Sequence, residues 1–440
     1  MKDLHIEYTD KEITPWGGMV LLKNMLHQTK FEQAIDSCPE LPQPGSNRGY
    51  TPHTIIESFI ASVWCGANKF SHTEILRHDI PLGRIFEWRS TPAQDVYKRY
   101  FAKFKQKTNH QVFNHLFKWF FNQLQFNDYT IDFDSSVLTR YGQQEGAKRG
   151  YNPKKHGRVS HHPLMAFVAD CNMVANCWLR SGNTSSSNNF VGFIEETLSR
   201  MENKKVGLVR LDSGFYDSAI FNMLEEKQLQ YIISAPMYAP LQRKLANETK
   251  WLSLAEGIDV CSGEYQQSGW KLPRRIIMIR QSIAERPKAG GKQLKLFKDL
   301  ELYQKYRFSC LVTNITLPPA EVWRTYRHRA EAENKIKELK YDFGFDSFNI
   351  HSFYGTEATL NFVMMAYNMM SLFRHFILRN KEHRRLSTLR YNTFAIGSYL
   401  VQNGNQVILK MSLSLKRREW FTGLWDKSRA FSFPVDFSNA

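Results

Sequence analysis

Cysteine and long apolar segments are scarce in this sequence. The six cysteines form no Cys-x-x-Cys pair, which excludes a zinc knuckle and offers no disulfide framework; they are Cys38, Cys65, Cys171, Cys177, Cys261 and Cys310. No apolar run follows the charged N-terminus, so a signal peptide is not expected. The most apolar segment, residues 362–378, contains Asn368, Arg374 and His375, which favours a buried helix over a membrane span. We expect a cytoplasmic protein without a membrane partner.

Acidic residues are also few relative to basic ones. The 440 residues include 42 Asp plus Glu against 59 Lys plus Arg, for a net charge of +17, and 42% are hydrophobic. The apolar content excludes global disorder. Basic residues outnumber acidic ones by 8 to 2, 6 to 1 and 9 to 1 in residues 84–118, 140–158 and 271–298. Such clusters fit a polyanionic partner, because each can neutralise several phosphates.

Residues 1–125 are expected to form an all-α domain. Thr51 and Thr91 each precede a proline, which is the pattern of an N-cap followed by proline at the first helical position. After Thr91, apolar residues recur at helical spacing and leave a basic face. The basic residues of that face include Lys98, Arg99 and Lys103. Two interpretations remain open for it: a solvated surface, or a surface that binds DNA.

Residues 126–235 alternate between strand and helix patterns. The expected strands cover residues 129–138, 163–170, 174–180, 206–211 and 231–235. Turn residues after the second strand favour three antiparallel strands in succession, and helices near residues 188–203 and 216–228 separate the remaining strands. Three antiparallel strands that lead into β-α-β-α-β are the order of the RNase H-like fold.

The pattern changes again in the rest of the chain. Residues 236–315 are expected to form a β-rich insertion. A single helix is expected from Pro319 to about Tyr341, within residues 316–345. Residues 346–440 are expected to form a helical, basic C-terminal region. The fold class is therefore α/β, with an all-α domain before the sheet and helices after it.

Three carboxylates stand where separate elements can bring them together. Asp134 lies near the end of the first strand, Asp212 directly follows the strand at 206–211, and Glu333 lies within the long helix. Mg²⁺ binds through a few carboxylates plus substrate phosphates, so such a trio is typical of phosphodiester cleavage. Asp132 shares the strand face of Asp134 and remains an alternative first carboxylate. Taken singly, an aspartate at a strand end is more often a turn or cap residue.

One face of the long helix carries four different functional groups. Tyr326, Arg329, Glu333 and Lys340 follow one another at steps of 3, 4 and 7 residues, which confines them to an arc of about 60°. A phenol, a guanidinium, a carboxylate and an ammonium group side by side fit a phosphate-binding site. An exposed ladder of ion pairs, such as Arg329 with Glu333, is the alternative interpretation.

At these residues the sequence resembles the DDE transposases of bacterial insertion sequences. Tyr326-x₂-Arg329-x₃-Glu333-x₆-Lys340 matches the Tyr-x₂-Arg-x₃-Glu-x₆-Lys signature of one large group at every position. Residues 211–216 are similar to that group's second aspartate motif, and Asp134-Ser-Ser136 is similar to its first, with Ser136 in place of the usual threonine. The resemblance covers roughly residues 50–380.

The resemblance implies a magnesium-dependent enzyme, with Mn²⁺ as a substitute, in which Asp134, Asp212 and Glu333 hold the metal ions. It implies an RNase H-like catalytic domain with a β-strand insertion before the glutamate, which agrees with the 121 positions that separate Asp212 from Glu333. In the family, the tyrosine, arginine and lysine of the signature contact DNA phosphates. Lys154 and Lys155, in a basic stretch, are expected to contact DNA as well.

The partners that the resemblance implies are double-stranded DNA, as terminal inverted repeats and target DNA, and a second copy of the chain. Some members hold a flipped base on an aromatic residue of the insertion, and Trp251 and Trp270 are candidates for that role. Two other functions remain open: a DNA-binding regulator derived from a transposase, and a stand-alone RNase H-like nuclease. The complete carboxylate trio favours an enzyme, and a separate helical domain with a basic insertion favours end-specific recognition.

Overall fold

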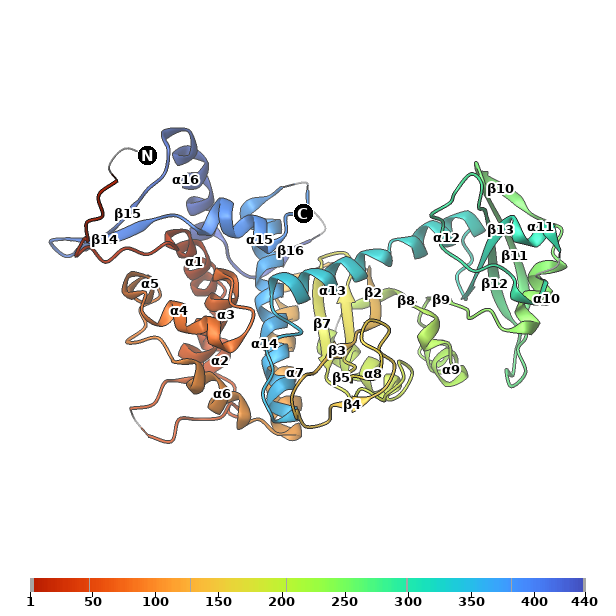
Figure 1. Ribbon diagram of the computed structural model, residues 1–440, viewed down its shortest axis with the longest axis horizontal. Helices are drawn as coiled ribbons and strands as arrows, with labels where there is room; N and C mark the ends of the chain where they lie inside the picture. The colour runs from red at the N-terminus through yellow and green to blue at the C-terminus, as the bar shows by residue number, and fades with distance from the viewer. Residues whose placement is uncertain are drawn as a thin grey trace.

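The computed structural model describes residues 4–46, 48–126, 128–202, 204–297, 300–380 and 382–437. The molecule is elongated (Figure 1). Helices from both ends of the chain form one end, a mixed sheet lies in the middle, and strands from residues 252–313 form the other end. The fold is mixed α/β, as expected. Among the described residues, no helix combines the length and the apolar character that a bilayer span requires.

The middle of the sheet contains the strands expected in residues 126–235. β2 (Asp128–Ser135), β6 (Leu164–Val168) and β7 (Met173–Trp178) are successive antiparallel neighbours. β8 (Lys205–Leu211) lies parallel to β2, and β9 (Tyr231–Ser234) lies parallel to β8. α8 (Phe190–Met201) precedes β8, and α9 (Ser218–Glu226) connects β8 to β9. The elements follow one another along the chain as expected, and the strands lie in the order β7-β6-β2-β8-β9 in the sheet.

The strands of the expected insertion continue the same sheet. β13 (Tyr306–Thr313) pairs with β9, and β12 (Arg274–Ser282), β11 (Ile258–Tyr265) and β10 (Leu252–Ala255) follow outward. The expected boundary between residues 235 and 236 therefore lies within one continuous sheet. Two short helices flank these strands, α10 (Ala239–Ala246) and α11 (Glu301–Gln304).

The expected long helix is divided into α12 (Pro319–Arg327) and α13 (Ala330–Asp342). At the division, the Arg329 N–H donates to the Tyr326 carbonyl at 3.0 Å, and the Ala332 N–H donates to the Arg329 carbonyl at 2.9 Å. Hydrogen bonds there span three residues instead of four, which tightens the turn. Figure 1 shows α13 continuing in the direction of α12. The prediction of a single unbroken helix was wrong at this turn, which lies beside the candidate site.

α14 (Phe353–Leu372) is the buried column that joins the sheet to the N-terminal helices (Figure 1). It packs against α3 (Pro52–Cys65), α6 (Gln94–Ala102), α7 (Gln106–Asn122) and β7. The Asn368 side chain bonds to both the N–H and the carbonyl of Val174 at 2.8 Å, and Ser371 Oγ donates to the Asn172 carbonyl at 2.7 Å. The polar residues of this apolar segment therefore fasten it to the sheet, which agrees with the expectation of a buried helix.

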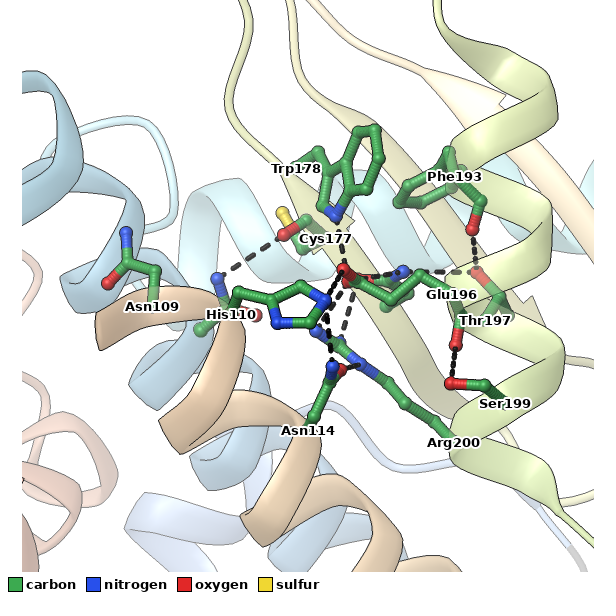
Figure 2. A network of polar contacts seen from close by, with 12 residues as sticks. Asn109, His110, Asn114, Cys177, Trp178, Phe193, Glu196, Thr197, Ser199 and Arg200 are labelled. Carbon is green, nitrogen blue, oxygen red and sulfur yellow. Dashed lines mark hydrogen bonds and ion pairs between the residues drawn. The ribbon is translucent and has the colours of Figure 1, made fainter. Parts of the chain in front are cut away.

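A second polar network joins α7 to α8 and β7 (Figure 2). Glu196 accepts hydrogen bonds from Trp178 Nε1 at 2.8 Å and from Arg200 Nη2 at 2.7 Å, and His110 Nε2 lies 3.4 Å from its other oxygen. Arg200 Nε also donates to Asn114 Oδ1 at 2.8 Å. Because the side chains of Glu196 and Arg200 are nearly inaccessible to solvent, this network holds the helical part against the sheet.

The described part of residues 1–125 is mainly helical, as expected. The remaining helices there are α1 (Val20–Gln28), α2 (Phe31–Asp36), α4 (Glu74–Arg77) and α5 (Ile80–Ile85). Thr51 is the N-cap of α3, and its hydroxyl accepts from the Thr54 N–H. Thr91 is not an N-cap: α6 begins at Gln94, whose N–H donates to Glu74 Oε1 at 2.6 Å. That prediction was wrong because a carboxylate 20 residues away satisfies the helix end.

The C-terminal region is only partly helical, which corrects the expectation for residues 346–440. α15 (Leu386–Leu389) and α16 (Leu415–Ala430) flank a hairpin of β14 (Ser398–Asn403) and β15 (Gln406–Met411). α16 packs on α1, and β16 (Val435–Asp436) pairs with β1 (Leu124–Gln125). The two ends of the sequence therefore pack together. A small sheet of β3 (Leu138–Thr139), β5 (Val159–His161) and β4 (Lys148–Arg149) lies beyond β2 in sequence.

Candidate active site

Asp134 and Asp212 lie at the ends of neighbouring strands. β2 and β8 are parallel, so their carboxyl ends meet at the same edge of the sheet. Asp134 is buried, and its Oδ1 accepts from the Ser135 N–H at 2.7 Å. Asp212 is partly exposed, and its Oδ1 accepts from the Gly214 N–H at 2.8 Å. The local turns therefore hold both carboxylates and leave the Oδ2 atoms free to face a common partner.

That common partner is the guanidinium of Arg329. Its Nη2 lies 3.2 Å from Asp134 Oδ2, 3.7 Å from Asp212 Oδ2 and 3.3 Å from the Phe133 carbonyl. Arg329 is only 7% exposed, and its Nε has no hydrogen-bond partner among the described residues. The tight turn between α12 and α13 carries this residue, so the distortion of the helix occurs where a cation enters the carboxylate pair.

The Asp134 carboxyl group is poised between its two protonation states. Burial raises its pKa to about 6, against an ordinary value of 3.8. The Arg329 guanidinium lowers this pKa, and the charges of Asp212 and Glu333 raise it. Without a cation beside it, the buried carboxylate would be costly to ionise. The Arg329 guanidinium, which faces both Asp134 and Asp212, therefore offsets part of the cost of ionising Asp134.

Glu333 is the third predicted carboxylate and lies on α13, one turn after Arg329. Its side chain is exposed and makes no hydrogen bond or ion pair with any residue that the structure describes. Its charge still acts on the Asp134 carboxyl group, so it faces the same region. Within the described residues, the oxygen atoms of Asp134, Asp212 and Glu333 do not all lie within 4.8 Å of one another. The guanidinium of Arg329 occupies the place between Asp134 and Asp212.

Asp132, the alternative first carboxylate, has a different partner. Both of its oxygens accept from Arg210 on β8, with Nε at 2.6 Å from Oδ1 and Nη2 at 2.8 Å from Oδ2. Asp132 is fully buried, and Arg210 also donates to the Thr325 carbonyl at 2.7 Å. Because both oxygens of Asp132 already accept from Arg210, a metal ion would have to compete with this bidentate pair. The geometry therefore favours Asp134 over Asp132 as the first member of the trio.

The other residues of the signature also face the strand ends. The Tyr326 hydroxyl donates to the Leu211 carbonyl at 3.2 Å, and Lys340 Nζ donates to the Val137 carbonyl at 3.0 Å. Burial raises the pKa of Tyr326 and lowers the pKa of Lys340. The carboxylate partners of Arg329 are the two aspartates and not Glu333. An exposed ladder of ion pairs is therefore the wrong interpretation of this helix face.

A basic cavity of about 780 Å³ adjoins this site. Tyr326, Arg329 and Glu333 line one side of it, and the loop that follows β12 lines another. That loop contributes Arg286, Lys288 and Lys292 around two adjacent glycines. The sequence analysis noted the basic stretch at 271–298, but it did not place the loop opposite the signature helix. Here the basic loop borders the same space as Glu333 and Arg329, which suits a phosphodiester chain.

Two further residues near the site were missed in the sequence. His162 Nδ1 lies 2.8 Å from the Thr184 carbonyl, and burial lowers the pKa of this histidine, on which the charges of Asp212 and Lys340 also act. Ser186 Oγ lies 2.9 Å from Ser135 Oγ, the residue after Asp134. The histidine was detectable only as half of a His-His pair before a strand, and the serine as part of a Ser-rich loop.

Lys154 and Lys155 lie near the signature lysine. Together with Lys340 and Arg140 they line a hollow of about 380 Å³, which Asp346 also borders. Both side chains are exposed. Two of the predicted DNA-binding residues therefore extend the basic surface from the end of α13, although each was chosen only because it belongs to a basic stretch of sequence.

The basic face of α6 is found as expected, although part of it is engaged. Lys98 Nζ lies 3.3 Å from Asp95, and Lys103 Nζ donates to the Gln43 carbonyl at 2.9 Å. Arg99 is exposed, while the apolar residues of the same helix are buried against α14 and its neighbours. A role for this face in DNA binding stays a prediction.

The two tryptophans proposed to hold a flipped base are packed against arginines. Trp270 is 7% exposed, with the guanidinium of Arg274 4.6 Å from its ring centre. Trp251 Nε1 donates to the Glu248 carbonyl at 2.9 Å, and the guanidinium of Arg280 lies 4.7 Å from its ring centre. A base would have to displace an arginine from either ring, so the base-stacking role stays a prediction for both.

One other cluster brings possible metal ligands together, on the N-terminal helices. Ligand atoms of Glu32, Asp36 and His53 lie within 4.8 Å of one another. His53 Nε2 is 3.4 Å from Glu32, and His53 Nδ1 is 3.8 Å from Asp36, so each ring nitrogen faces a different carboxylate. A metal ion would bind only one of these nitrogens. The geometry is that of a surface ion pair, and the cluster lies apart from the β2–β8 site (Figure 1).

Comparison with known proteins identifies a matching family model and a similar solved structure. The family model described as transposase DDE domain group 1 matches residues 1–430. The structure is similar, with a TM-score of 0.48 and 11% sequence identity, to a cryo-EM structure of the piggyBac transposase synaptic complex with hairpin DNA, over 88% of this chain and 82% of that one. No curated protein sequence matched the chain. Because the family model covers almost its full length, the chain belongs to the transposase DDE domain group 1 family.

Proposed function

We propose that this DNA transposase serves a bacterial insertion sequence: it binds the terminal inverted repeats, cuts DNA at the element ends and joins them to target DNA. The observation that carries the proposal is that Asp134 and Asp212 both face the guanidinium of Arg329, with Glu333 facing them from α13. The order of strands in the middle of the sheet supports an RNase H-like catalytic core. In this proposal the helices of residues 1–125 read the repeats, and two copies act on paired ends.

The carboxylate trio fits divalent metal ions by the chemistry of its donors. Asp134 and Asp212 already share the guanidinium of Arg329. Glu333 adds a third carboxylate, which has no ion-pair partner among the described residues. We infer that these three residues hold Mg²⁺, with Mn²⁺ as a substitute, because hard oxygen ligands suit both ions. When bound, the metal ions supply a water- or hydroxyl-derived nucleophile and neutralise the charge that develops on the leaving oxygen.

In this proposal the side chains around the trio hold the DNA. Metal ions held by the aspartates would displace Arg329, whose planar guanidinium would then be available to two oxygens of a phosphate. Lys340 provides a point charge at the far end of α13, and the Tyr326 hydroxyl is a donor beside Asp212. Arg286, Lys288 and Lys292 can track the DNA backbone on the opposite wall of the cavity.

The two alternatives differ from this proposal in the chemistry they need. A DNA-binding regulator would not require a buried carboxylate with a raised pKa beside a basic cavity. A stand-alone nuclease would not require a large helical part fastened to the sheet through α14 and the network around Glu196. Both features favour an enzyme that acts at defined DNA ends.

The test is cleavage and joining of a labelled element end by purified protein with Mg²⁺, resolved on a denaturing gel. Asp134→Asn, Asp212→Asn and Glu333→Gln should each lower cleavage by at least about a thousandfold while end binding persists, because each removes a metal ligand. Glu331→Gln and Asp217→Asn are matched controls, exposed carboxylates on α13 and at the start of α9, and should cut normally. Normal cutting by any trio variant, or full activity in EDTA, would contradict the proposed mechanism.

A further inference from the structure

The segment of residues 4–8 has the pattern of a β-strand but pairs with nothing. Leu4, Ile6 and Tyr8 are 77%, 80% and 98% exposed, although each is a large apolar side chain. They alternate with His5 and Glu7, so in an extended chain all three share one face. Within the described part of the chain, residues 4–8 make no hydrogen bond or ion pair. Apolar side chains that alternate along an exposed segment are typical of a β-strand whose partner strand belongs to another molecule.

The β14–β15 hairpin, in the described structure, lacks a strand beside the outer edge of β15. It protrudes at the end of the molecule opposite the β10–β13 strands (Figure 1), and in the described structure β15 pairs only with β14. Val407, Leu409 and Met411 alternate along β15, as Leu4, Ile6 and Tyr8 do along the arm. A two-stranded hairpin is at best marginally stable in water, and a third strand is what usually stabilises it. The outer edge of β15 is therefore a vacant strand position.

The arm cannot fill this position on its own hairpin in the register that the structure has. Thr14 and Ser398 form an antiparallel bridge, with hydrogen bonds of 2.8 Å in both directions, on the β14 side of the hairpin. Continuing that register places Thr9 opposite Asn403, the last residue of β14. Leu4, Ile6 and Tyr8 would then extend past the end of the strand. In this register the apolar part of the arm lies beyond the end of its own β14, which leaves it available to another molecule.

Charge indicates that this other molecule is a protein and not DNA. Residues 4–12 contain Glu7, Asp10 and Glu12 against Lys11, in a chain whose net charge is +17. The hairpin itself carries one charged residue, Lys410, and the basic residues Lys416, Arg417 and Arg418 follow it. An acidic arm is repelled by phosphates and attracted to the basic body of another copy. Lys11 and Glu12 fix the base of the arm, over the Tyr399 ring and against Arg84.

We propose that residues 4–9 of one copy form a third strand on the outer edge of β15 in a second copy, and that the exchange is mutual. Each arm then extends the other copy's hairpin to three strands, and a twofold axis closes the assembly. Main-chain hydrogen bonds would supply the pairing, and Leu4, Ile6 and Tyr8 would lie beside Val407 and Leu409 on the same face of the sheet. The arms and hairpins lie far from the β2–β8 site in Figure 1, so the dimer leaves that site open to DNA.

The full-length protein without DNA or metal is the sample for the test, so the result does not depend on the proposed catalytic function. Sedimentation equilibrium over a range of concentrations should give a monomer–dimer equilibrium. Ile6→Asp combined with Tyr8→Asp should raise the dimer Kd at least about tenfold, because charges would enter the apolar face. His5→Asp combined with Thr9→Asp is the matched control: it adds the same charge on the other face and should change Kd by less than about threefold.

A cross-linking experiment identifies the contact itself. Ile6→Cys in one preparation and Leu409→Cys in another should form a disulfide-linked pair when mixed and oxidised, since all six native cysteines are buried. A wild-type protein that stays monomeric at every concentration would overturn the proposal. Equal weakening of dimer formation by the two double variants would also overturn it. So would a chain with both cysteines that, at high dilution, forms the disulfide only within one molecule.

Discussion

Replacement of Arg329 by glutamine isolates the ion pair at the centre of the site. Without metal, the change removes the cation that lies 3.2 Å from the buried Asp134 and 3.7 Å from the partly exposed Asp212. Breaking a buried pair costs about 3–5 kcal/mol, and we expect the lower value because solvent screens the Asp212 contact. For a chain of 440 residues that unfolds cooperatively, about 3 kcal/mol corresponds to a fall in Tm of about 3 °C.

A metal ion should reverse this loss. In the wild-type protein, Ca²⁺ must displace the guanidinium before it can bind between the aspartates, so part of its binding free energy is spent on breaking the ion pair. In Arg329→Gln no cation competes for the site. If displacement costs about 1.5–3 kcal/mol, the variant should bind Ca²⁺ about 10- to 100-fold more tightly than the wild type does. Ca²⁺ should accordingly raise the Tm of the variant more than that of the wild type.

Calorimetric titration with Ca²⁺ and differential scanning calorimetry with and without Ca²⁺ measure both effects on DNA-free protein. Arg324→Gln is the matched control, because Arg324 is an exposed arginine of the preceding helix that pairs only with Glu321 among the described residues. It should leave Tm and Ca²⁺ affinity within error of the wild type. Equal or weaker Ca²⁺ binding by Arg329→Gln would refute the reasoning, since it would mean that the arginine does not occupy the place of a metal ion.

Two further predictions concern pH and DNA binding. Because the pKa of Asp134 is about 6 in the folded protein against 3.8 ordinarily, the folded state binds this proton more tightly than the unfolded chain does. The metal-free protein should therefore lose about 3 kcal/mol of unfolding free energy as pH rises from about 4 to above 6, and Asp134→Asn should remove this part of the pH dependence in denaturant titrations. Replacing Lys98, Arg99 and Lys103 at once, each by glutamine, should weaken binding to an element end. The plot of log binding constant against log salt concentration should also become less steep, by about 0.9 for each lost phosphate contact. An unchanged slope would place DNA recognition elsewhere than α6.

The strands in the middle of the sheet could be predicted because their signals are local. β6 and β7 are short apolar runs joined by turn residues, and Asn172 adopts the left-handed conformation that such a turn requires. The continuation of the sheet through β13 could not be predicted. β9 and β13 are separated by more than 70 residues, and no periodicity within either strand specifies which edge it joins.

The signature residues were found in the sequence, but the partners of their side chains were not. Helical spacing placed Arg329 and Glu333 on one face, which left a choice between phosphate binding and a local ion pair. The structure gives a third answer, because Arg329 reaches across to the ends of β2 and β8. Which acceptor a long side chain finds depends on the packing of α13 against the sheet, and this packing is not encoded in helical periodicity. The same limit applies to Asp132, whose pairing with Arg210 arises from the register of β2 and β8.

The position of Arg329 has a consequence for the order in which ligands act on the site. If Asp134 and Asp212 hold a metal ion as proposed, its binding would release the guanidinium of Arg329, and a DNA phosphate that took up the guanidinium would free the two carboxylates. Each ligand therefore lowers the free energy that the other must spend on breaking the same ion pair. By thermodynamic linkage, metal must strengthen DNA binding by the same factor by which DNA strengthens metal binding. In this proposal Arg329 offsets part of the carboxylate charge in the absence of DNA, and the metal site would be completed most readily when an element end is already bound.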